Sequence, residues 1–431
     1  MIKFNEMNVD EASFDKCFVD FLKKRNPLTN DISSQVSEII RNVRENGDLA
    51  LKEYSMKFDG FDGDVFLVSK KEINQALKDI ETDLMDSLEY AFSKILDYQG
   101  QCFKTLELES FDEHISRKFR VIDSLGIYIP GGKASYPSTV LMGAAPAIAC
   151  GVENIFISSP TQNGLLNSLT IAAAKVAGID KIYKIGGAQA IAALAIGTEQ
   201  VVKVDKIIGP GNVFVAEAKK QLFGEVGIDS IAGPSEIVVF ADKTSDPETI
   251  AWDLMAQSEH DSDASGVLVC SCEKVIENVK EIINKEIKSL ERCSIIKSSI
   301  ESNGMIFRIK DNSQAKRIIN SIAPEHLHIA FDHENCEDEN KLVAGLILKG
   351  TVSANSFSDY VLGPSHILPT NTSSRFSSPL SVEDFLVSYS FISLDKNNTE
   401  ELEEFIKHTS RIANSEGLTA HAISAEKRLK D

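Results

Sequence analysis

A carboxylate and an imidazole stand next to each other in one short stretch, Ala323-Pro324-Glu325-His326-Leu327, where a polar segment leads into an apolar strand predicted from Leu327 to Phe331. Pro324 biases the residue before it toward extended backbone, so we expect a helix to end here. Because histidine titrates near neutrality and a partly buried glutamate can be tuned toward it, Glu325 and His326 could act as an acid/base pair. The alternative is a salt-bridged strand edge without catalytic function.

A second pair of polar side chains ends the helix that we predict from Asp246 to about His260. Gln257 continues the apolar face marked by Ile250 and Leu254, and His260 follows three residues later. An amide oxygen and an imidazole nitrogen could therefore be presented to one point. The alternative is a partly buried histidine whose hydrogen bonds are satisfied within the core.

Two more potential ligands stand far away in the sequence. Asp359 lies in a loop rich in glycine, serine and proline, where a lone aspartate is usually a turn residue, and His421 lies in a polar tail, where a lone histidine is usually exposed. Spacing alone cannot bring them to Gln257 and His260. If the four side chains converge, two nitrogens and two oxygens form a set that suits zinc and is acceptable to manganese or cobalt.

Glycines occur where predicted strands pass into helices, in three separate turns. At such a turn glycine lets the backbone approach a phosphate, and the N-terminus of the next helix supplies amide donors. None of the turns has the GxGxxG fingerprint, and each could be a plain tight turn. Along one sheet edge they could together cradle a dinucleotide: Tyr128-Ile129-Pro130-Gly131-Gly132, Gly186-Gly187-Ala188-Gln189 and Gly209-Pro210-Gly211-Asn212.

The chain alternates predicted strands and helices from about residue 119, beginning with a strand from Arg120 to Ile129. A second series follows Gly233-Pro234-Ser235-Glu236, with strands at 237–241, 266–270 and 305–309 and a helix near Asn340 to Ala344. Such alternation implies parallel sheets with helices on both faces. We therefore predict an α/β fold of two Rossmann-like doubly wound domains, with a helical N-terminal flank and a C-terminal helical tail.

The composition is that of a globular protein of two or three domains: 431 residues, of which 43% are hydrophobic and 25% charged. A net charge of -19 argues against nucleic acid and anionic membrane as partners. It does not exclude an anionic cofactor, because loop amides and helix N-termini bind phosphate locally. The longest apolar run, Thr139 to Val152, is too short to cross a bilayer and contains Pro146.

The N-terminus and the cysteines predict a cytoplasmic location. Residues 1–6 lack the charged and apolar regions of a signal peptide. The seven cysteines form no paired framework, and only Cys270 and Cys272 are close, in a strand-like run where small buried side chains are the expected role. A reducing compartment fits this usage.

These motifs, in their order and combination, resemble the histidinol dehydrogenase family, and the similarity covers nearly the whole chain from about residue 25. The resemblance implies a zinc- and NAD-dependent four-electron oxidation of L-histidinol to L-histidine by way of the aldehyde, in histidine biosynthesis. The matching stretches are Gly126-Ile127-Tyr128-Ile129-Pro130-Gly131-Gly132-Lys133, Gly186-Gly187-Ala188-Gln189-Ala190, Gly209-Pro210-Gly211-Asn212, Ala232-Gly233-Pro234-Ser235-Glu236, Gln257-Ser258-Glu259-His260-Asp261, Ala323-Pro324-Glu325-His326-Leu327, Ser358-Asp359-Tyr360 and Glu416-Gly417-Leu418-Thr419-Ala420-His421.

Carried over position by position, the resemblance implies three groups of site residues. His326 would take protons as hydride leaves, and Glu325 would activate the water that hydrates the aldehyde. One zinc ion per subunit would be bound by Gln257, His260, Asp359 and His421. Substrate would be contacted by these four ligands and by Ser235, His326, His366 and Glu416, and the NAD site would be lined by Tyr128, Gln189 and Asn212.

The resemblance also implies a homodimer with shared active sites, in which the C-terminal tail crosses to the partner. We expect an N-terminal arm over residues 1–25 and a first α/β domain, with the metal and catalytic residues, over 26–125 and 236–378. A second α/β domain over 126–235 would bind NAD, and the tail would cover 379–431.

The sequence departs from the family pattern at few positions. Gly143 stands where asparagine is common, His328 stands where an acidic or amide residue is usual, and the loop before Asp359 also differs. None of these removes a proposed ligand or catalytic group. Three alternatives stay open: a dehydrogenase of the same fold for another small alcohol such as a sulfonated diol, a zinc hydrolase in which Glu325 activates a zinc-bound water, and a non-catalytic binding protein.

Overall fold

The computed structural model describes residues 2–25, 30–106, 114–131, 136–162, 164–332, 341–395 and 397–428. The chain divides into two compact units. The first unit comprises Met1–Thr105 and Val121–Leu386, and the second comprises Leu106–Arg120 and Val387–Asp431.

One sheet of the first unit has six parallel strands in the order β1-β10-β9-β8-β11-β12. Their bounds are β1 (Glu6–Asn8), β8 (Glu236–Ala241), β9 (Ser265–Cys270), β10 (Met305–Arg308), β11 (His326–Ile329) and β12 (Leu346–Lys349). In the register of β11, His326 stands between Ile237 and Leu346. The Glu325-His326 pair therefore lies at the amino end of a strand that has a neighbour on each side.

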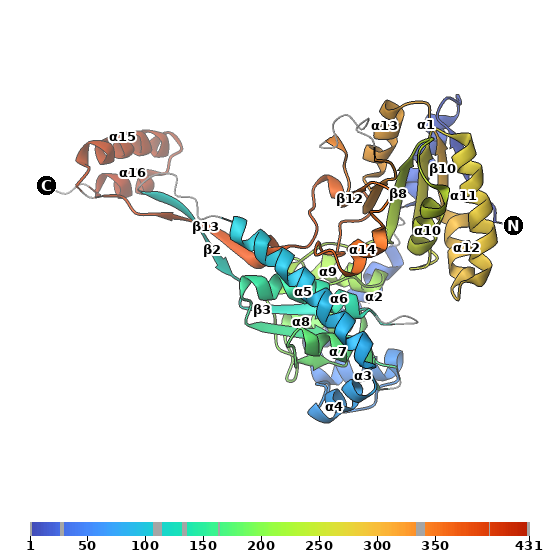
Figure 1. Cartoon of the computed structure of the whole chain (residues 1–431). Coiled ribbons are helices and arrows are strands. Elements are labelled where there is room, and N and C mark those ends of the chain that lie inside the picture. The colour runs from blue at the N-terminus through green and yellow to red at the C-terminus, as the bar shows by residue number, and fades with distance from the viewer. Residues whose placement is uncertain are drawn as a thin grey trace. The chain divides into compact units, whose positions relative to one another are not determined.

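Both faces of this sheet are buried under helices (Figure 1). Along β8, Ile237 and Val239 pack toward α10 (Pro247–Ser258), α11 (Glu273–Glu286) and α12 (Cys293–Asn303). Val238 and Phe240 pack on the opposite face, toward α1 (Phe14–Lys24) and α13 (Asn312–Ile322). A strand covered on both faces is a continuous apolar run, because successive side chains point to opposite faces.

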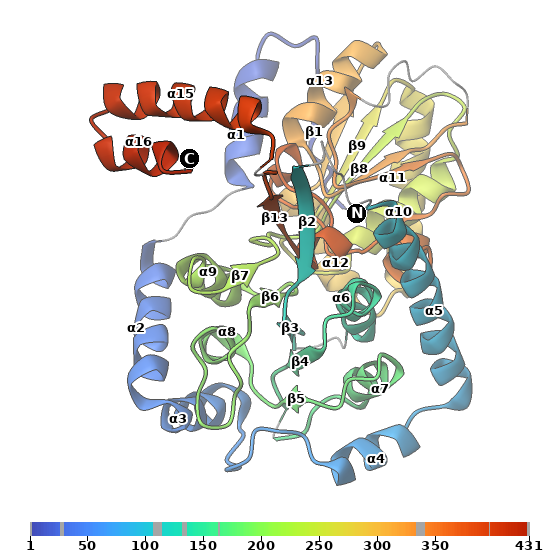
Figure 2. The same cartoon turned by 90° about the vertical axis from the view of Figure 1, so that its left-hand side faces the viewer.

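The other sheet of the first unit has five parallel strands in the order β5-β4-β3-β6-β7. Figure 2 shows α8 and α9 on one side of it and α6 and α7 on the other. The strands are β3 (Ser124–Tyr128), β4 (Asn154–Ser158), β5 (Ile182–Tyr183), β6 (Lys206–Ile208) and β7 (Gly227–Ile228). The helices are α2 (Asn30–Asn46), α3 (Asp48–Asp59), α4 (Lys70–Lys78), α5 (Thr82–Thr105), α6 (Pro137–Cys150), α7 (Ser168–Val176), α8 (Gly187–Ile196) and α9 (Val213–Leu222).

The second unit contains β2 (Ile115–Val121), which pairs with β13 (Leu386–Ile392), together with the helices α15 (Thr399–Ser415) and α16 (Thr419–Glu426). The sequence predicted only helices for this tail, so the strand β13 is an addition. The sequence does carry a strand signal there, because Val387, Tyr389 and Phe391 alternate with serines, and that signal was missed.

The fold-class prediction is confirmed: the structure is α/β, with parallel sheets that carry helices on both faces. Two local predictions were wrong. The strand predicted from Arg120 to Ile129 is two strands in different sheets, because the chain turns at Asp123, where Oδ2 of Asp205 accepts the backbone amides of Asp123 and Ser124. The stretch predicted as a helix near Asn340 to Ala344 begins outside the described residues, and its described part has 3-10 backbone only at Lys341 before irregular chain leads into β12.

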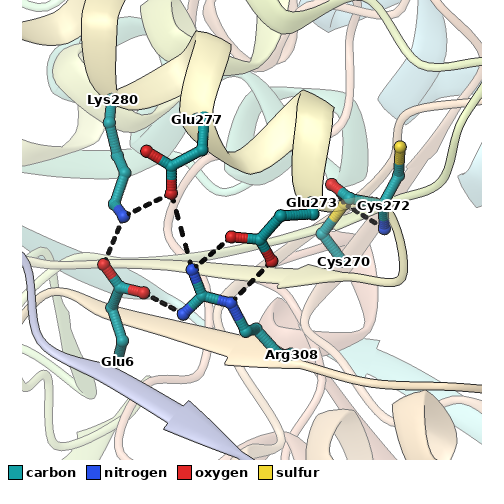
Figure 3. Close-up of polar contacts among 7 residues, drawn as sticks. All are labelled: Glu6, Cys270, Cys272, Glu273, Glu277, Lys280 and Arg308. Carbon is teal, nitrogen blue, oxygen red and sulfur yellow. Dashed lines mark hydrogen bonds and ion pairs between the residues drawn. The ribbon is translucent and has the colours of Figure 1, made fainter.

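The short strand β1 was not predicted. Glu6 ties it to the neighbouring elements, because its carboxylate meets the guanidinium of Arg308 and the ammonium of Lys280 (Figure 3). Arg308 also donates from Nε and Nη2 to the two carboxylate oxygens of Glu273, at 2.8 Å each. A three-residue strand has too few side chains for a periodic pattern, so this ion network could not be read from the sequence.

The predicted domain boundaries at residues 25, 125, 235 and 378 stay predictions. Within the described ranges, helices long and apolar enough to span a bilayer are absent. The cysteines that the structure describes are free, including Cys270 and Cys272.

Candidate active site

The Glu325-His326 pair follows an unusual turn at the end of α13. Ala323 has φ +45° and ψ +63° and its amide donates to the carbonyl oxygen of Ile319 at 2.7 Å. The helix therefore ends before Pro324 as predicted, but Ala323 is left-handed rather than extended. The left-handed residue closes the helix, a role that glycine usually fills, and it turns the chain directly into β11.

Glu325 and His326 are both buried, and they contact each other. Oε2 of Glu325 accepts the backbone amide of Glu236 at 2.8 Å and lies 3.4 Å from Nε2 of Gln257. The same oxygen lies 3.5 Å from Nδ1 of His326, and Nε2 of His326 lies 3.5 Å from Oδ1 of Asp359. Burial lowers the pKa of His326, but the carboxylates of Glu325 and Asp359 outweigh it and raise that pKa to about 10.

Two of the predicted zinc ligands meet at the amide of Asn355. Its Nδ2 lies 3.2 Å from Oε1 of Gln257 and 3.2 Å from Oδ2 of Asp359, so the two oxygens face one point. Gln257 projects from the last turn of α10, and Asp359 projects from the short helix α14 (Asn355–Tyr360) rather than from a loop. His260 lies just beyond α10 and is close enough for its charge to act on Asp359.

Burial raises the pKa of Asp359, but the hydrogen bond and charge of His326 outweigh it and hold that pKa below its usual value. Within the described ranges, no three His, Cys, Asp or Glu side chains gather closely enough to hold a metal ion by themselves. The amide oxygen of Gln257 adds a donor of another kind. An amide oxygen, a carboxylate and a nearby imidazole are chemically suited to zinc.

His366, which the sequence predicts to contact substrate, lies beside Asp359. Its Nδ1 lies 2.9 Å from the carbonyl oxygen of Asp359, and its Nε2 lies 3.3 Å from Oγ1 of Thr139 on α6. Burial lowers the pKa of this imidazole. Ser235 immediately precedes β8, and its carbonyl oxygen accepts the amide of Ser265 at 2.9 Å.

Glu416 and His421 belong to the second unit. Glu416 follows α15, and His421 lies in the first turn of α16; both are exposed. The structure thus gathers Gln257, Glu325, His326, Asp359 and His366 in the first unit and leaves these two predicted residues on another body.

A cavity of about 880 Å³ lies at the carboxyl ends of β3 and β4 and the N-terminus of α8. It is lined by the predicted cofactor residues Tyr128, Gln189 and Asn212, together with Gly131 and Gly187. In an open parallel sheet this edge is the usual place for a ligand. Gly132 and Lys133, from the first predicted glycine turn, lie outside the described residues.

Each of the three predicted cofactor residues has a distinct place in this cavity. Oη of Tyr128 accepts the amide of Gly187 at 3.0 Å, and burial raises the pKa of Tyr128 to about 12. Nε2 of Gln189 is buried without a hydrogen-bond partner in the described structure, so it can donate to a ligand. Oδ1 of Asn212 caps α9 through two backbone amides.

The turn after β6 needs its glycine. Gly209 has φ +107°, and a Cβ placed there would lie 2.1 Å from the carbonyl oxygen of Tyr128. A buried ion pair fixes this turn: Nζ of Lys219 donates to the carbonyl oxygen of Gly209 and to Oδ1 of Asp229, at 2.6 Å each. Oδ2 of Asp229 accepts the amide of Gly209 at 2.8 Å.

Asp59 is a cavity residue that the sequence did not reveal. It is the last residue of α3 and lines the cavity beside Tyr128 and Gln189. Burial raises the pKa of its carboxyl group to about 6, against the lowering effect of the amide of Gly186. The only sequence signal is an aspartate before Gly60, which indicates a turn and nothing more. Asn355 and Glu236 were also missed, since an amide before a short helix and a glutamate opening a strand carry no motif by themselves.

Comparison with known proteins identifies the family. The family model described as histidinol dehydrogenase matches residues 22–429. The chain belongs to the histidinol dehydrogenase family. It is 40% identical over 437 aligned positions to histidinol dehydrogenase of Hydrogenovibrio crunogenus, with 100% of each chain covered. It is 44% identical to that of Oceanobacillus iheyensis, with 91% of this chain and 92% of the relative covered.

A solved structure gives the same result. The crystal structure of histidinol dehydrogenase from Elizabethkingia anophelis superposes with a TM-score of 0.91 at 31% identity, covering 99% of this chain and 98% of that chain. Membership in this family makes the chain an oxidoreductase, as predicted. It decides against the zinc hydrolase and against the non-catalytic binding protein.

Proposed function

We propose that this enzyme oxidises L-histidinol to L-histidine in histidine biosynthesis, through L-histidinaldehyde, with two NAD molecules and a bound zinc ion. The observation that carries the proposal is that Glu325 and His326 form one cluster of contacting side chains with Gln257 and Asp359. An acid/base pair beside metal-type donors suits an alcohol oxidation that needs both proton transfer and a fixed substrate. The family and the relatives named above support histidinol as the alcohol, ahead of a sulfonated diol.

The proposed zinc ligands are Gln257, His260, Asp359 and His421. Zinc bound there would hold the imidazole and amino groups of the substrate and so fix its carbinol carbon for hydride removal. The remaining substrate contacts would come from Ser235, His326, His366 and Glu416. NAD, which accepts the hydride in each step, would lie against Tyr128, Gln189 and Asn212.

His326 is the proposed proton acceptor in both oxidations. In the first step the hydroxyl group gives its proton to His326 while the carbinol carbon loses a hydride. The aldehyde then adds one water, with Glu325 taking a proton from that water. In the second step His326 takes the proton of the hydrate as the second hydride leaves. His326 gives its first proton to solvent before the second step, and the sum consumes one water and two NAD and yields histidine, two NADH and three protons.

The charges of Glu325 and Asp359 oppose this use of His326 until a cation is bound. A proton acceptor must enter each step neutral, but Glu325 and Asp359 raise the pKa of His326. Because Asp359 is also a proposed metal ligand, charge that it gives to a bound cation no longer stabilises the imidazolium. His326 would then lose its proton more easily.

We also propose a homodimer in which the tail over residues 379–431 brings Glu416 and His421 to the site of the partner subunit. Support comes from the exposed apolar side chains of the second unit, of which Ile392, Ile412 and Ile423 are 61%, 60% and 53% exposed. Among its described hydrophobic residues only Ala413 and Ala422 are buried. A small unit with this much exposed apolar surface is typical of a segment that packs on another chain.

The proposed domain division assigns residues 26–125 and 236–378 to metal binding and catalysis, residues 126–235 to NAD, and residues 1–25 to an arm. We place the enzyme in the cytoplasm, which the free thiols of the described cysteines support.

The test is the stoichiometry of NADH formed from NAD and L-histidinol before chelation, after chelation and with zinc restored. Two NADH per histidinol, lost on metal removal and recovered with zinc, would establish the four-electron, zinc-dependent reaction. A folded, zinc-loaded enzyme that forms no NADH from histidinol would overturn the proposal and direct the search to other small alcohols.

A further inference from the structure

An arginine from the N-terminal arm reaches the back of the candidate active site. Nη2 of Arg25 lies 2.6 Å from Oε1 of Glu236, and the two side chains are only 10% and 4% exposed. Arg25 follows directly on α1, whereas Glu236 opens β8. A buried pair of this kind contributes to stability only when both partners stay in place, because either one alone would be an uncompensated charge.

The main chain of Glu236 holds both members of the proposed acid/base pair. Its amide donates to Oε2 of Glu325 at 2.8 Å, and its carbonyl oxygen lies 3.3 Å from Nδ1 of His326. A shift of this one peptide would therefore move the hydrogen-bond partners of Glu325 and His326 together. The side chain of Glu236 points to Arg25, so the ion pair is one of the contacts that hold this residue, beside its pairing with Ser265 on β9.

The charge of Arg25 partly offsets the cost of burying the carboxylate of Glu236. Burial raises the pKa of Glu236, and the neighbouring charge of Glu325 raises it further. Arg25 opposes both effects, with additional help from the backbone amide of Asn371. Without the guanidinium, two carboxylates would share a buried site with less compensation, which is the arrangement that low dielectric penalises most.

The arm that carries Arg25 is anchored independently of the site. Phe14, Phe18 and Phe21 of α1 pack edge-on against the ring of Phe307 at centroid distances of 5.5 to 6.2 Å. The guanidinium of Arg25 lies 5.5 Å from the ring centroid of Phe21. Further upstream, the ion network of Glu6 fixes β1 (Figure 3). Arg25 is thus presented by a fixed element rather than by a free terminus.

We propose that Arg25 is a positioning residue of the active site, which acts through Glu236 on the placement of Glu325 and His326. This inference rests on the roles proposed above for Glu325 and His326. It makes the N-terminal arm part of the catalytic apparatus, although no residue of the arm belongs to the predicted site.

The test compares Arg25→Ala with Arg317→Ala in the full-length, zinc-loaded enzyme. Arg317 is a matched control, because it also binds α1, donating to Asp15 at 2.6 Å and lying 5.8 Å from the centroid of Phe14, but it does not contact Glu236. We expect Arg25→Ala to lower kcat about 10- to 100-fold with KM for histidinol nearly unchanged, since a small misplacement of catalytic groups is costly. Arg317→Ala should keep kcat within about twofold.

Two further readouts separate positioning from a general loss of structure. Added guanidinium at concentrations that leave the fold intact should restore part of the kcat of Arg25→Ala and none of any deficit in Arg317→Ala. Hydrogen exchange of the Glu236 amide should become about tenfold faster in Arg25→Ala only, because that amide depends on the hydrogen bond to Glu325.

Unchanged kcat in Arg25→Ala, or equal losses in both variants, would overturn the inference. So would unchanged exchange at the Glu236 amide. The exchange measurement needs no substrate, so it decides whether Arg25 holds Glu236 even if the wild-type enzyme forms no NADH from histidinol. A wild-type enzyme that forms no NADH would refute the proposed function but would leave the proposed role of Arg25 to the exchange measurement.

Discussion

Nδ1 of His328 lies 2.6 Å from Oδ2 of Asp253, and both side chains are almost completely buried. Nε2 of the same imidazole lies 3.0 Å from the carbonyl oxygen of Gly350. One ring nitrogen faces a carboxylate and the other a carbonyl, an arrangement that favours a doubly protonated, positively charged ring. The pair joins β11, which begins with His326, to α10, which carries Gln257 one turn after Asp253.

This pair should make stability depend on pH. Burial lowers the pKa of His328, but the hydrogen bonds to Asp253 and Gly350 outweigh it and raise the pKa above its ordinary value. For a histidine whose folded pKa is raised, the added stability is complete below the unfolded pKa of about 6.5 and is lost as pH rises through the folded pKa. We therefore expect the free energy of unfolding to fall as pH rises above about 6.5.

Asp253→Asn should reduce the free energy of unfolding at pH 6 by about 1–3 kcal/mol, because it removes the charged partner of a buried imidazolium. The variant should also show a smaller decrease in the free energy of unfolding as pH rises above about 7. Urea unfolding between pH 5 and 9 measures both effects, with Glu281→Gln on the exposed side of α11 as the control. A variant with an unchanged pH profile would show that His328 is neutral in the folded protein.

Glu325 and His326 should divide the two oxidation steps between them. Glu325→Gln should slow the oxidation of histidinaldehyde much more than that of histidinol, since only the aldehyde step needs an activated water. His326→Asn should slow both steps, by about 100-fold or more, because each requires a proton acceptor. Single-turnover formation of NADH from histidinol and, separately, from histidinaldehyde measures the two effects.

Zinc content should be measured in the same samples, because Glu325 lies 3.4 Å from the amide of Gln257, a proposed ligand. With zinc retained, an equal loss in both steps for Glu325→Gln would refute the division. Retention of the alcohol step in His326→Asn would show that another group accepts the first proton.

Local patterns predicted most of the first unit because its strands and helices follow simple rules. The continuous apolar run of β8 indicates a strand buried on both faces, and Asp246 with Pro247 predicts the start of α10, where the structure has an aspartate cap and a proline in the first turn. The glycine turns end strands at the sheet edge that borders the cavity. These features depend on residues close in sequence, which a periodic pattern can report.

The contacts that organise the site depend on residues far apart, and no local pattern encodes them. Asn355 joins Gln257 to Asp359 by an amide group that looks like an ordinary helix start. Arg25 meets Glu236 only because α1 packs on the face of the sheet. The resemblance to a family predicts which residues bind the metal. The residues that position those proposed ligands are identified only by the three-dimensional structure.

Asp59 should influence both stability and cofactor binding. Burial raises the pKa of its carboxyl group to about 6, so its charged form is disfavoured in the folded protein. For an aspartate with a raised pKa, stability is highest below the unfolded pKa near 4 and falls as pH rises through about 6. Asp59→Asn should therefore raise the free energy of unfolding at pH 7.5 by about 1 kcal/mol, after allowance for partial exposure of the group, and by little at pH 4.

The same variant should change how the affinity for NADH depends on pH, because the half-buried carboxylate lines the cavity proposed for the cofactor. Titration calorimetry with NADH at pH 5.5 and pH 7.5 should show a pH dependence in the wild type that Asp59→Asn loses. Asp62→Asn, an exposed neighbour three residues away, serves as the control. Equal pH dependence in all three proteins would show that Asp59 does not face the cofactor.

Mixed dimers should test whether the tail completes the site of the partner subunit. His260→Ala and His421→Ala each remove one proposed zinc ligand, so each homodimer should be inactive and bind zinc poorly. If the tail crosses, a mixed dimer contains one site with both histidines intact and one site with neither. Random exchange of subunits should then restore about a quarter of the wild-type sites.

Activity and zinc content of the mixture, after subunit exchange verified by differently tagged chains, measure this recovery. Mixing His260→Ala with Gln257→Ala is the matched control, because both residues lie at the end of α10 in the same subunit and every mixed site then lacks a ligand. Recovery in the first mixture and none in the second identifies crossing by the tail. If neither mixture recovers although mixed dimers are present, His421 serves its own subunit, and the second unit must fold back on the chain that carries it.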